Sequence, residues 1–203
     1  MKLAGVHCHL GSTIKQLEPI RDCAKRLNEI VTQIRPQIQT DQPIINVGGG
    51  LGIKYNPDDS DYPSVNDYVS CFSSIENSLL IFEPGRSLVG NTGILIGQVI
   101  GIKNDNCLVT DLSMTECIRP ALYDAYHHVT PVCLPDKENQ KENLEKETKS
   151  FKVVGPVCES ADFVNKSVAL PPLQSGDLIA LWDVGAYCSV LGSNYNMRGR
   201  RGF

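Results

Sequence analysis

The sequence predicts an α/β segment built on a parallel sheet, followed by a mostly antiparallel β domain, a barrel or a sandwich. In residues 1–86, short apolar runs alternate with helical patterns, an order typical of a parallel sheet with right-handed crossovers. In residues 87–203, apolar runs bounded by Gly, Pro and Asn follow one another, and most have no regular helix between them. We therefore expect a domain boundary near residue 87.

Three apolar runs in the first part are expected to form buried strands. They cover residues 5–10, 43–47 and 79–82, and they end in Gly11-Ser12, in Gly48 to Gly50, and in Glu83-Pro84-Gly85-Arg86. In parallel sheets of this type the chemistry is found at the carboxyl ends of the strands. All of these motifs fall at such ends, so we expect them to form one site.

Two helices are expected between these strands, over residues 20–34 and 65–78. The first has apolar residues near 3.6-residue spacing and is closed by Pro36. In the second part, β runs are expected over residues 93–103, 107–111, 151–157 and 176–183. The charged insert at 136–150 has one apolar residue, Leu144, and we expect a solvated helix or a mobile loop there.

The bulk composition is that of a globular protein without a nucleic-acid or membrane partner. The chain has 203 residues, of which 41% are hydrophobic, and a net charge of −4, with no basic face. No apolar run approaches the roughly 18 residues of a membrane span. Two histidines interrupt the start of the chain, which therefore lacks the apolar core of a secretory signal. We expect a cytoplasmic protein or, if organellar, a processed one.

The eight cysteines form no C-x-x-C pair, so neither a zinc ribbon nor that redox motif is supported. Without a secretory signal, free thiols are expected rather than disulfides. His7 and His9 share one face of a strand, but a metal needs further ligands, and His127-His128 shows no metal spacing. We expect no metal site. His9 can be a packed, hydrogen-bonded residue or can stack on a flat cofactor ring.

The other motifs are each ambiguous when taken alone. Glycines 48–50 can bring backbone N–H groups close to a phosphate or can form a tight turn. Glu83 can orient a cationic ring nitrogen or form a surface salt bridge, and the apolar run before it favours partial burial and a functional role. Arg119 and Tyr123, spaced four apart, can bind a carboxylate. Cys158-Glu159 at a turn can transfer protons or hold an ammonium group.

Taken together, the motifs resemble one family. HCHLGS, NVGGGLGI, EPGRSLVGNTG, IRPALYDAYH, VVGPVCESADF and GDLIALWDVGAY–SNYN occur in that order. They resemble the diaminopimelate decarboxylases, fold-type III pyridoxal-phosphate enzymes of the alanine-racemase-like group. The stretch Cys158-Glu159-Ser160 is similar to the corresponding stretch of these enzymes, whereas ornithine decarboxylases have Cys-Asp at this place. The resemblance implies a (β/α)8 barrel followed by a β domain, with the three βα units here being the last three of the barrel.

The resemblance also implies a role for each candidate residue. His9 and Cys158 are the implied catalytic residues. The cofactor, pyridoxal 5'-phosphate, would be held by His9 on the ring, by Glu83 at the pyridinium nitrogen, and by Ser12, Gly48, Gly49, Gly50, Gly85, Arg86 and Tyr187 around the phosphate. The substrate meso-diaminopimelate would meet Arg86, Arg119 and Tyr123 at its distal carboxylate, Glu159 at its distal ammonium group, and Tyr187. Cys158 would return a proton to the substrate after CO2 leaves, giving L-lysine.

In this family Cys158 and Glu159 enter the site from the second subunit of a head-to-tail dimer, so a homodimer is implied. This sequence departs from the family pattern at Leu112-Ser113, usually Ala-Gly, at Val184, usually Ala, and at residues 188–190. No lysine here lies in a motif like Y-A-V-K-A-N, which carries the family's covalent cofactor anchor. We therefore expect a truncated chain with little activity alone. The alternative is a non-catalytic paralogue that regulates a full-length decarboxylase.

Overall fold

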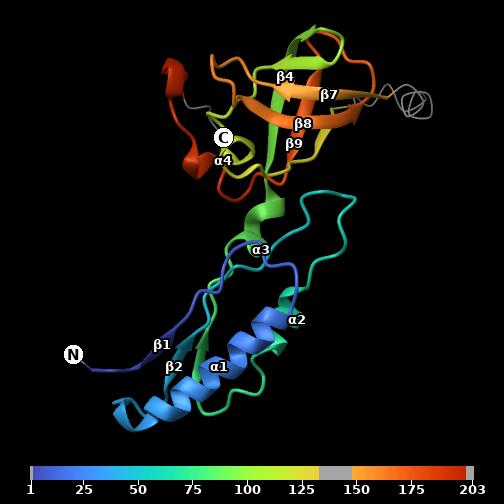
Figure 1. The fold of residues 1–203 in the computed structure, drawn as a ribbon. Helices are drawn as coiled ribbons and strands as arrows, with labels where there is room; N and C mark the ends of the chain where they lie inside the picture. Colours follow the sequence, from blue (N-terminus) through green and yellow to red (C-terminus); the bar gives the residue numbers. More distant parts are fainter. Residues whose placement is uncertain (1, 133–147, 200–203) are drawn as a thin grey trace. The chain divides into compact units, whose positions relative to one another are not determined.

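The computed structural model describes residues 2–132 and 148–199, which divide into two compact units (Figure 1). The first unit comprises Met1–Lys54 and Asp59–Val89. The second comprises Tyr55–Asp58 and Gly90–Phe203. Each unit has its own hydrophobic core, as expected for separately packed domains.

The first unit is built on a parallel three-stranded sheet. Its strands are β1 (Gly5–His7), β2 (Ile44–Asn46) and β3 (Leu79–Ile81), in the order β1-β2-β3. All three are in register, because Gly5 pairs with Ile44 and Ile44 pairs with Leu79. The parallel pairing expected from the order of the sequence elements is therefore observed, and the strands end at the same edge of the sheet.

Helix α1 (Glu18–Ile34) lies along this sheet (Figure 1). Its buried residues Ile20, Ala24, Leu27 and Val31 recur every three or four positions, so they form one apolar stripe that packs against the core residue Ile45 of β2. Pro19 stands in its first turn, where a missing N–H costs nothing. The 3-10 helix η1 (Arg35–Gln37) follows directly. The predicted helix over residues 20–34 is confirmed.

Helix α2 (Val65–Ser70) is shorter than the expected range 65–78. It begins with a capping box, in which the Ser64 and Asp67 side chains each accept from the other residue's backbone N–H. Beyond Ser70 the backbone hydrogen bonds span three residues instead of the four of an α-helix. One example runs from Ser73 N–H to Ser70 O at 3.2 Å. Serine side chains compete with helical bonding, and Asn77 adopts φ 56°, so the helix cannot continue to residue 78.

The second unit is a mixed six-stranded sheet in the order β6-β9-β4-β5-β7-β8. The strands are β4 (Ile94–Lys103), β5 (Cys107–Thr110), β6 (Val129–Pro131), β7 (Lys149–Val154), β8 (Phe163–Leu170) and β9 (Leu178–Trp182). Every neighbouring pair is antiparallel except β5 and β7, which are parallel. The edge strands β6 and β8 contact each other, so the sheet is nearly closed.

Short helices complete the chain. They are α3 (Arg86–Val89) and η2 (Gly90–Thr92) before β4, α4 (Arg119–Tyr123) after β5, and η5 (Ser189–Leu191) and η6 (Tyr195–Met197) near the end. Strands β6 and β8 and helix α4 were not expected from the sequence. Most of the predicted insert at 136–150 lies outside the described residues, but its last two positions, Lys149 and Ser150, begin β7.

No helix in the described ranges is long and apolar enough to cross a membrane.

Glycines at the end of β2 allow backbone segments to approach closely. A Cβ on Gly49 would lie 2.2 Å from the Glu83 carbonyl oxygen, and one on Gly50 would lie 2.1 Å from the Gly11 carbonyl oxygen. Gly48 and Gly50 also adopt φ values of 69° and 105°, which favour glycine. The three segments that leave the strands can therefore contact one another only because these side chains are absent.

We predict that Gly49→Ala destabilises the first unit by about 1–3 kcal/mol, because its new methyl group overlaps the Glu83 backbone. Urea unfolding, followed by circular dichroism at 222 nm to monitor α1, measures the loss. Gly101→Ala is the matched control, because nothing lies within 4 Å of its added Cβ. Gly101 lies in the second unit, so this variant should leave the unfolding transition of α1 unchanged. Equal unfolding midpoints for the two variants would contradict the prediction.

Candidate functional site

The polar motifs of the first unit meet where β1, β2 and β3 end. Hydrogen bonds continue the register past the strands, from Cys8 N–H to Asn46 O and from Glu83 N–H to Gly48 O, both at 2.9 Å. His9, Gly48 and Glu83 each lie two residues beyond a set of paired strand residues. They therefore stand side by side on three different segments.

His9 is fixed against the glycines. The Gly49 N–H donates to His9 Nδ1 at 3.3 Å, so in this arrangement the ring accepts at Nδ1 and its other nitrogen, Nε2, carries the proton. A Cβ on Gly48 would lie 2.9 Å from the same ring nitrogen. His9 itself is exposed. The imidazole thus has a set orientation and an open face.

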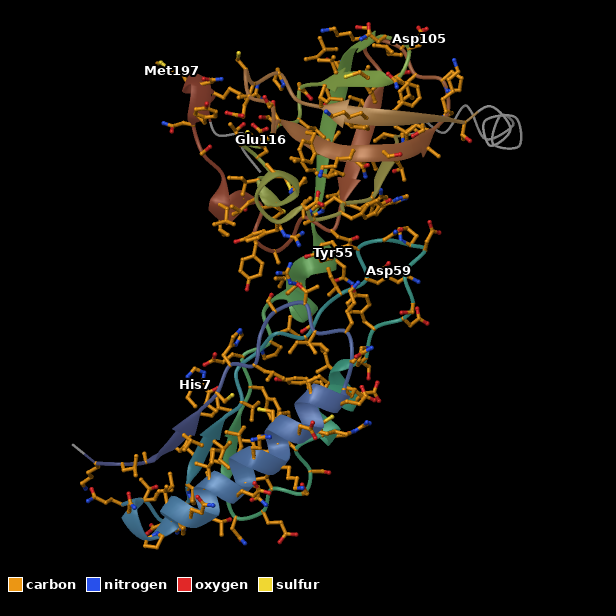
Figure 2. The ribbon with its side chains drawn as sticks, in the orientation of Figure 1. His7, Tyr55, Asp59, Asp105, Glu116 and Met197 are labelled. Carbon is orange, nitrogen blue, oxygen red and sulfur yellow. The ribbon has the colours of Figure 1, made fainter. Side chains whose placement is uncertain are left out.

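Glu83 is oriented by a residue that the sequence reasoning did not select. Asn46 Nδ2 donates to Glu83 Oε1 at 2.7 Å, while Asn46 Oδ1 accepts from the Gly48 N–H at 2.9 Å. His7, at the end of β1 (Figure 2), places Nε2 3.9 Å from Glu83 Oε2. The apolar run before Glu83 predicted partial burial, and half of its side-chain surface is covered, since 50% is exposed. Asn46 was detectable as the polar residue directly before the glycines.

Arg86 and Ser12 bring hydrogen-bond donors to the same edge of the sheet. Arg86 Nη2 donates to Ser12 Oγ at 3.3 Å, although the two residues are far apart in the sequence. Gly85 is exposed, and its carbonyl accepts from the Leu88 N–H at 3.1 Å as α3 begins. A guanidinium group, a hydroxyl group and nearby glycine backbone form a donor set that suits an anion such as a phosphate.

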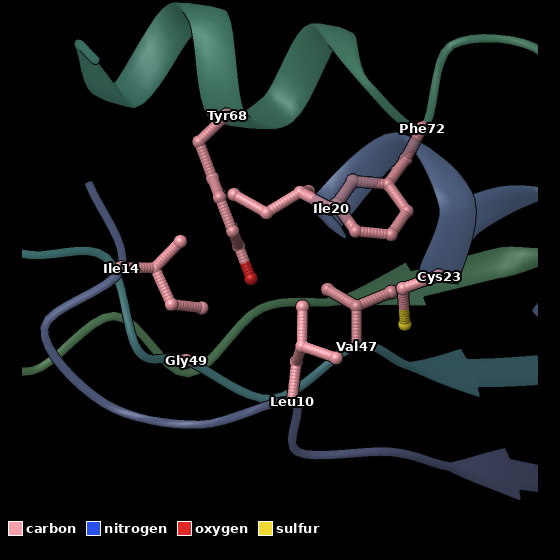
Figure 3. A pocket seen from close by; sticks show the side chains of 8 residues that line it. All are labelled: Leu10, Ile14, Ile20, Cys23, Val47, Gly49, Tyr68 and Phe72. Atoms are coloured by element: carbon pink, nitrogen blue, oxygen red, sulfur yellow. The ribbon is translucent and has the colours of Figure 1, made fainter. Parts of the chain in front are cut away.

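A small apolar cavity lies beside the glycines (Figure 3). It is lined by Leu10, Ile14, Ile20, Cys23, Val47, Gly49, Tyr68 and Phe72. The Tyr68 hydroxyl points into it and donates to the Gly48 carbonyl oxygen at 3.4 Å. Burial raises the pKa of Tyr68, so this hydroxyl keeps its proton at neutral pH. Tyr68 therefore supports the Gly48 backbone from the side of the hydrophobic core.

In the second unit, Arg119 is buried in a cluster with His127 and Tyr55. Only 5% of Arg119 is exposed, and its Nη1 donates to His127 Nε2 at 2.6 Å. The His127 Nδ1–H donates to the Trp182 carbonyl at 2.9 Å, so the ring is neutral in this arrangement. The guanidinium carbon lies 4.4 Å from the centre of the Tyr55 ring, a cation–π contact. Arg119 Nε has no hydrogen-bond partner within the described residues.

Two predicted site residues of the second unit are more exposed. Tyr123, at the end of α4, is 62% exposed, and the left-handed Asp124 ends the helix there. Tyr187 is 46% exposed and adopts φ 59°, a conformation that is costly for a tyrosine. Both side chains can therefore reach a ligand at the surface of this unit.

The turn that carries Cys158 and Glu159 is organised by a buried carboxylate. Asp162 is 4% exposed and accepts from the Val157 N–H and the Met114 N–H, each at 2.7 Å. It also accepts from the Ser113 hydroxyl at 3.0 Å. Cys158 and Glu159 are themselves exposed. Asp162 was not selected from the sequence, although it lies within the motif VVGPVCESADF.

Glu159 has a further neighbour in Tyr195, whose hydroxyl donates to Glu159 Oε2 at 3.5 Å. Tyr195 belongs to the SNYN motif, and its contact with Glu159 was not predicted from the sequence. The structure thus assembles two groups of predicted residues. His9, Ser12, Gly48, Gly49, Gly50, Glu83, Gly85 and Arg86 lie in the first unit, and Arg119, Tyr123, Cys158, Glu159 and Tyr187 lie in the second.

Comparison with known proteins identifies the family of this chain. The family model described as "Pyridoxal-dependent decarboxylase, C-terminal sheet domain" matches residues 7–185. A "Probable diaminopimelate decarboxylase, chloroplastic" of Oryza sativa subsp. japonica is 41% identical over 97% of this chain and 39% of its own length. The diaminopimelate decarboxylase of Aquifex aeolicus is 34% identical over 98% of this chain and 46% of its own length.

Solved structures give the same result. A diaminopimelate decarboxylase from Helicobacter pylori complexed with L-lysine has a TM-score of 0.82 at 32% identity, over 97% of this chain and 48% of that one. The enzyme from M. jannaschii in co-complex with L-lysine has a TM-score of 0.83 at 32% identity, over 97% and 45%. The chain therefore belongs to the pyridoxal-dependent decarboxylases, which are lyases, and it spans less than half the length of these relatives.

The residues of the first unit fit the family's cofactor. The Cβ positions of Gly48, Gly49 and Gly50 lie against Cys8, Glu83 and Gly11, so the absence of these side chains brings the ends of the three strands together. Arg86 and Ser12 supply donors suited to a phosphate, and the carboxylate held by Asn46 suits a protonated ring nitrogen.

We predict that Asp162→Asn loosens the Cys158–Glu159 turn and destabilises the second unit by about 1.5–3 kcal/mol, the range for hydrogen bonds to charged groups. The amide NH2 would face a backbone N–H that now donates to a carboxylate oxygen. Hydrogen exchange of the residue 155–161 amides should accelerate, and urea unfolding gives the free energy. Asp105→Asn, at the exposed β4–β5 turn (Figure 2), is the control. Unchanged exchange in Asp162→Asn would contradict the prediction.

Proposed function

We propose that this chain forms part of a diaminopimelate decarboxylase, which converts meso-diaminopimelate into L-lysine and CO2. The observation that carries the proposal is the group of residues at the strand ends of the first unit. Glu83 held by Asn46, the fixed imidazole of His9, and the Arg86–Ser12 pair stand together there. The relatives named diaminopimelate decarboxylase support the substrate assignment.

Pyridoxal phosphate, when bound, supplies an electron sink for the electron pair left behind when CO2 departs. In the proposed site Glu83 keeps the ring nitrogen protonated, and Asn46 holds this carboxylate in place. His9, whose imidazole is held by the Gly49 N–H, would pack against the ring. The phosphate is held by Ser12, Gly48, Gly49, Gly50, Gly85, Arg86 and Tyr187. Because Arg86 and Ser12 are already paired, little reorganisation is needed to bind an anion.

The substrate is held at its far end in this proposal. Arg86, Arg119 and Tyr123 bind the distal carboxylate, where a guanidinium fork suits bidentate pairing. Glu159 binds the distal ammonium group, and the Tyr195 hydroxyl orients that carboxylate. Tyr187 also contacts the substrate. The Cys158 thiol returns a proton to the reacting carbon. We propose that Cys158 and Glu159 serve the site of a second subunit in a homodimer.

The proposal also assigns the architecture. The three βα units would be the last three of a (β/α)8 barrel, spanning residues 1–86, and the β domain would span 87–203. Three strands cannot close a barrel, and no lysine here stands in the sequence context of the family's cofactor anchor. The chain alone should therefore turn over little diaminopimelate.

We predict that the chain becomes active when it is fused to the part of the rice relative that precedes the matched region. The measurement is CO2 release from meso-diaminopimelate with added pyridoxal phosphate, with the 203-residue chain assayed alone in parallel. Glu83→Gln in the fusion should lower kcat by about 10–100-fold, because it replaces a charged hydrogen bond worth about 1.5–3 kcal/mol. Cofactor absorbance checks that binding is retained.

Glu76→Gln is the matched control, because it removes a carboxylate a few residues before β3 and outside the proposed site. Its kcat should equal that of the unmodified fusion. The proposal fails if the fusion binds the cofactor but releases no CO2. The role of Glu83 fails if both glutamine variants retain full activity.

A further inference from the structure

Cys117 and Cys188 form a buried thiol pair that the decarboxylase function does not use. Their sulfur atoms lie 3.5 Å apart, although the residues are 71 positions apart in the sequence. Their exposed fractions are 0% and 3%. Cys117 stands two residues before Arg119, and Cys188 directly follows Tyr187. The pair therefore joins the segments that carry two predicted ligand-binding residues.

The surroundings of this pair favour a thiolate. The hydrogen bond that the Cys117 S–H donates to Cys188 Sγ lowers the pKa of Cys188 to about 5 against the effect of burial, and the charge of the Arg119 guanidinium acts in the same direction. The same hydrogen bond and burial raise the pKa of Cys117. In the fully protonated pair, Cys188 donates instead to the Ala186 carbonyl at 3.6 Å. Of the two thiols, Cys188 is therefore the one whose surroundings favour the thiolate.

A metal site is the competing interpretation, because ligand atoms of Cys117, His127 and Cys188 lie within 4.8 Å of one another. Both nitrogens of His127 are already engaged, however, one with the Trp182 carbonyl and one with Arg119. A metal ion would have to displace the guanidinium group and would lie beside its positive charge. This arrangement favours an anion over a cation.

We propose that Cys117 and Cys188 are a redox modification site at which hydrogen peroxide forms an intramolecular disulfide. The Cys188 thiolate attacks one peroxide oxygen, the O–O bond breaks, and the released hydroxide takes up a proton to give water and a Cys188 sulfenic acid. The Cys117 sulfur then attacks Cys188 Sγ and loses its proton to the departing hydroxyl group, which leaves as water. Two thiols are oxidised and one peroxide is reduced to two waters.

Geometry supports the second step. The sulfurs are in contact at 3.5 Å, so rotation of the side chains has to shorten the distance only to the disulfide length of about 2.05 Å. Burial keeps a bulky disulfide away from these sulfurs, so the oxidant in this proposal is a small one. The reaction itself does not depend on the proposed decarboxylase activity.

A second thiol pair in the same chain provides an internal comparison. Cys8 and Cys23 have sulfurs 3.8 Å apart, but burial raises the pKa of Cys23 to about 11, and no cationic group contributes to that shift. Because the thiolate is the reactive form, proximity alone should not make this pair react quickly. The two pairs therefore combine similar sulfur–sulfur distances with different surroundings, since Arg119 lies beside the Cys117–Cys188 pair.

The test is peptide mapping of the reduced 203-residue chain after timed exposure to hydrogen peroxide, with remaining thiols alkylated in denaturant. We expect the Cys117–Cys188 cross-link to form at least about tenfold faster than Cys8–Cys23 and to be reversed by dithiothreitol. In Cys117→Ser, Cys188 should stop at the sulfenic acid, which a 1,3-dione captures. In Cys188→Ser, Cys117 should not react.

If a serine variant fails to fold, the unmodified chain still decides the matter, because its selectivity for Cys117–Cys188 should disappear in urea. Equal rates for the two native pairs would overturn the proposal. So would stoichiometric binding of Co2+ with a thiolate charge-transfer band that is lost in both serine variants, which would establish a metal site instead. The readout is a mass and not a turnover, so it is independent of whether the fused enzyme decarboxylates diaminopimelate.

Discussion

The parallel register of β1, β2 and β3 is the constraint on which the candidate cofactor site depends. Because the three strands begin and end together, the residues that follow them emerge at one edge. His9, Gly48 and Glu83 are thereby neighbours in space, although they are far apart in the sequence. A shift of one residue in β2 would turn Asn46 away from Glu83, since successive strand residues point to opposite faces. The glycines are the second requirement, because the backbones that leave the strands pack against each other.

In the second unit, the buried carboxylate of Asp162 holds several segments together. The structure also explains two departures from the family pattern. Ser113, where the family has glycine, donates its hydroxyl to Asp162. Leu112, where the family has alanine, is fully buried in the core, and a Cβ on Gly97 would lie 2.2 Å from its Cγ. The larger side chains are therefore accommodated by one new hydrogen bond and by a facing glycine.

The sequence predicted those parts of the fold that depend on local pattern. The period of α1 and the apolar runs of β1, β2 and β3 are local properties, so their positions were found. The length of α2 was wrong, because serine bonding and the left-handed Asn77 override the apolar pattern after Ser70. Strand β8 was missed because Asn165 and Lys166 interrupt its apolar run, yet Asn165 is buried and donates to the His127 carbonyl. Asp162 and His127 were missed for a related reason, since only the folded chain gives them their partners.

Arg119 connects the buried thiols with the proposed substrate site. Within the described part of the chain, this buried cation makes no ion pair with a carboxylate, and its contacts are a neutral imidazole and the face of Tyr55. Burying an uncompensated charge is costly, so a thiolate at Cys188 supplies a nearby negative charge that lowers this cost. A disulfide is neutral and removes that charge. Oxidation of the pair would therefore leave the charge of the buried guanidinium without this compensation.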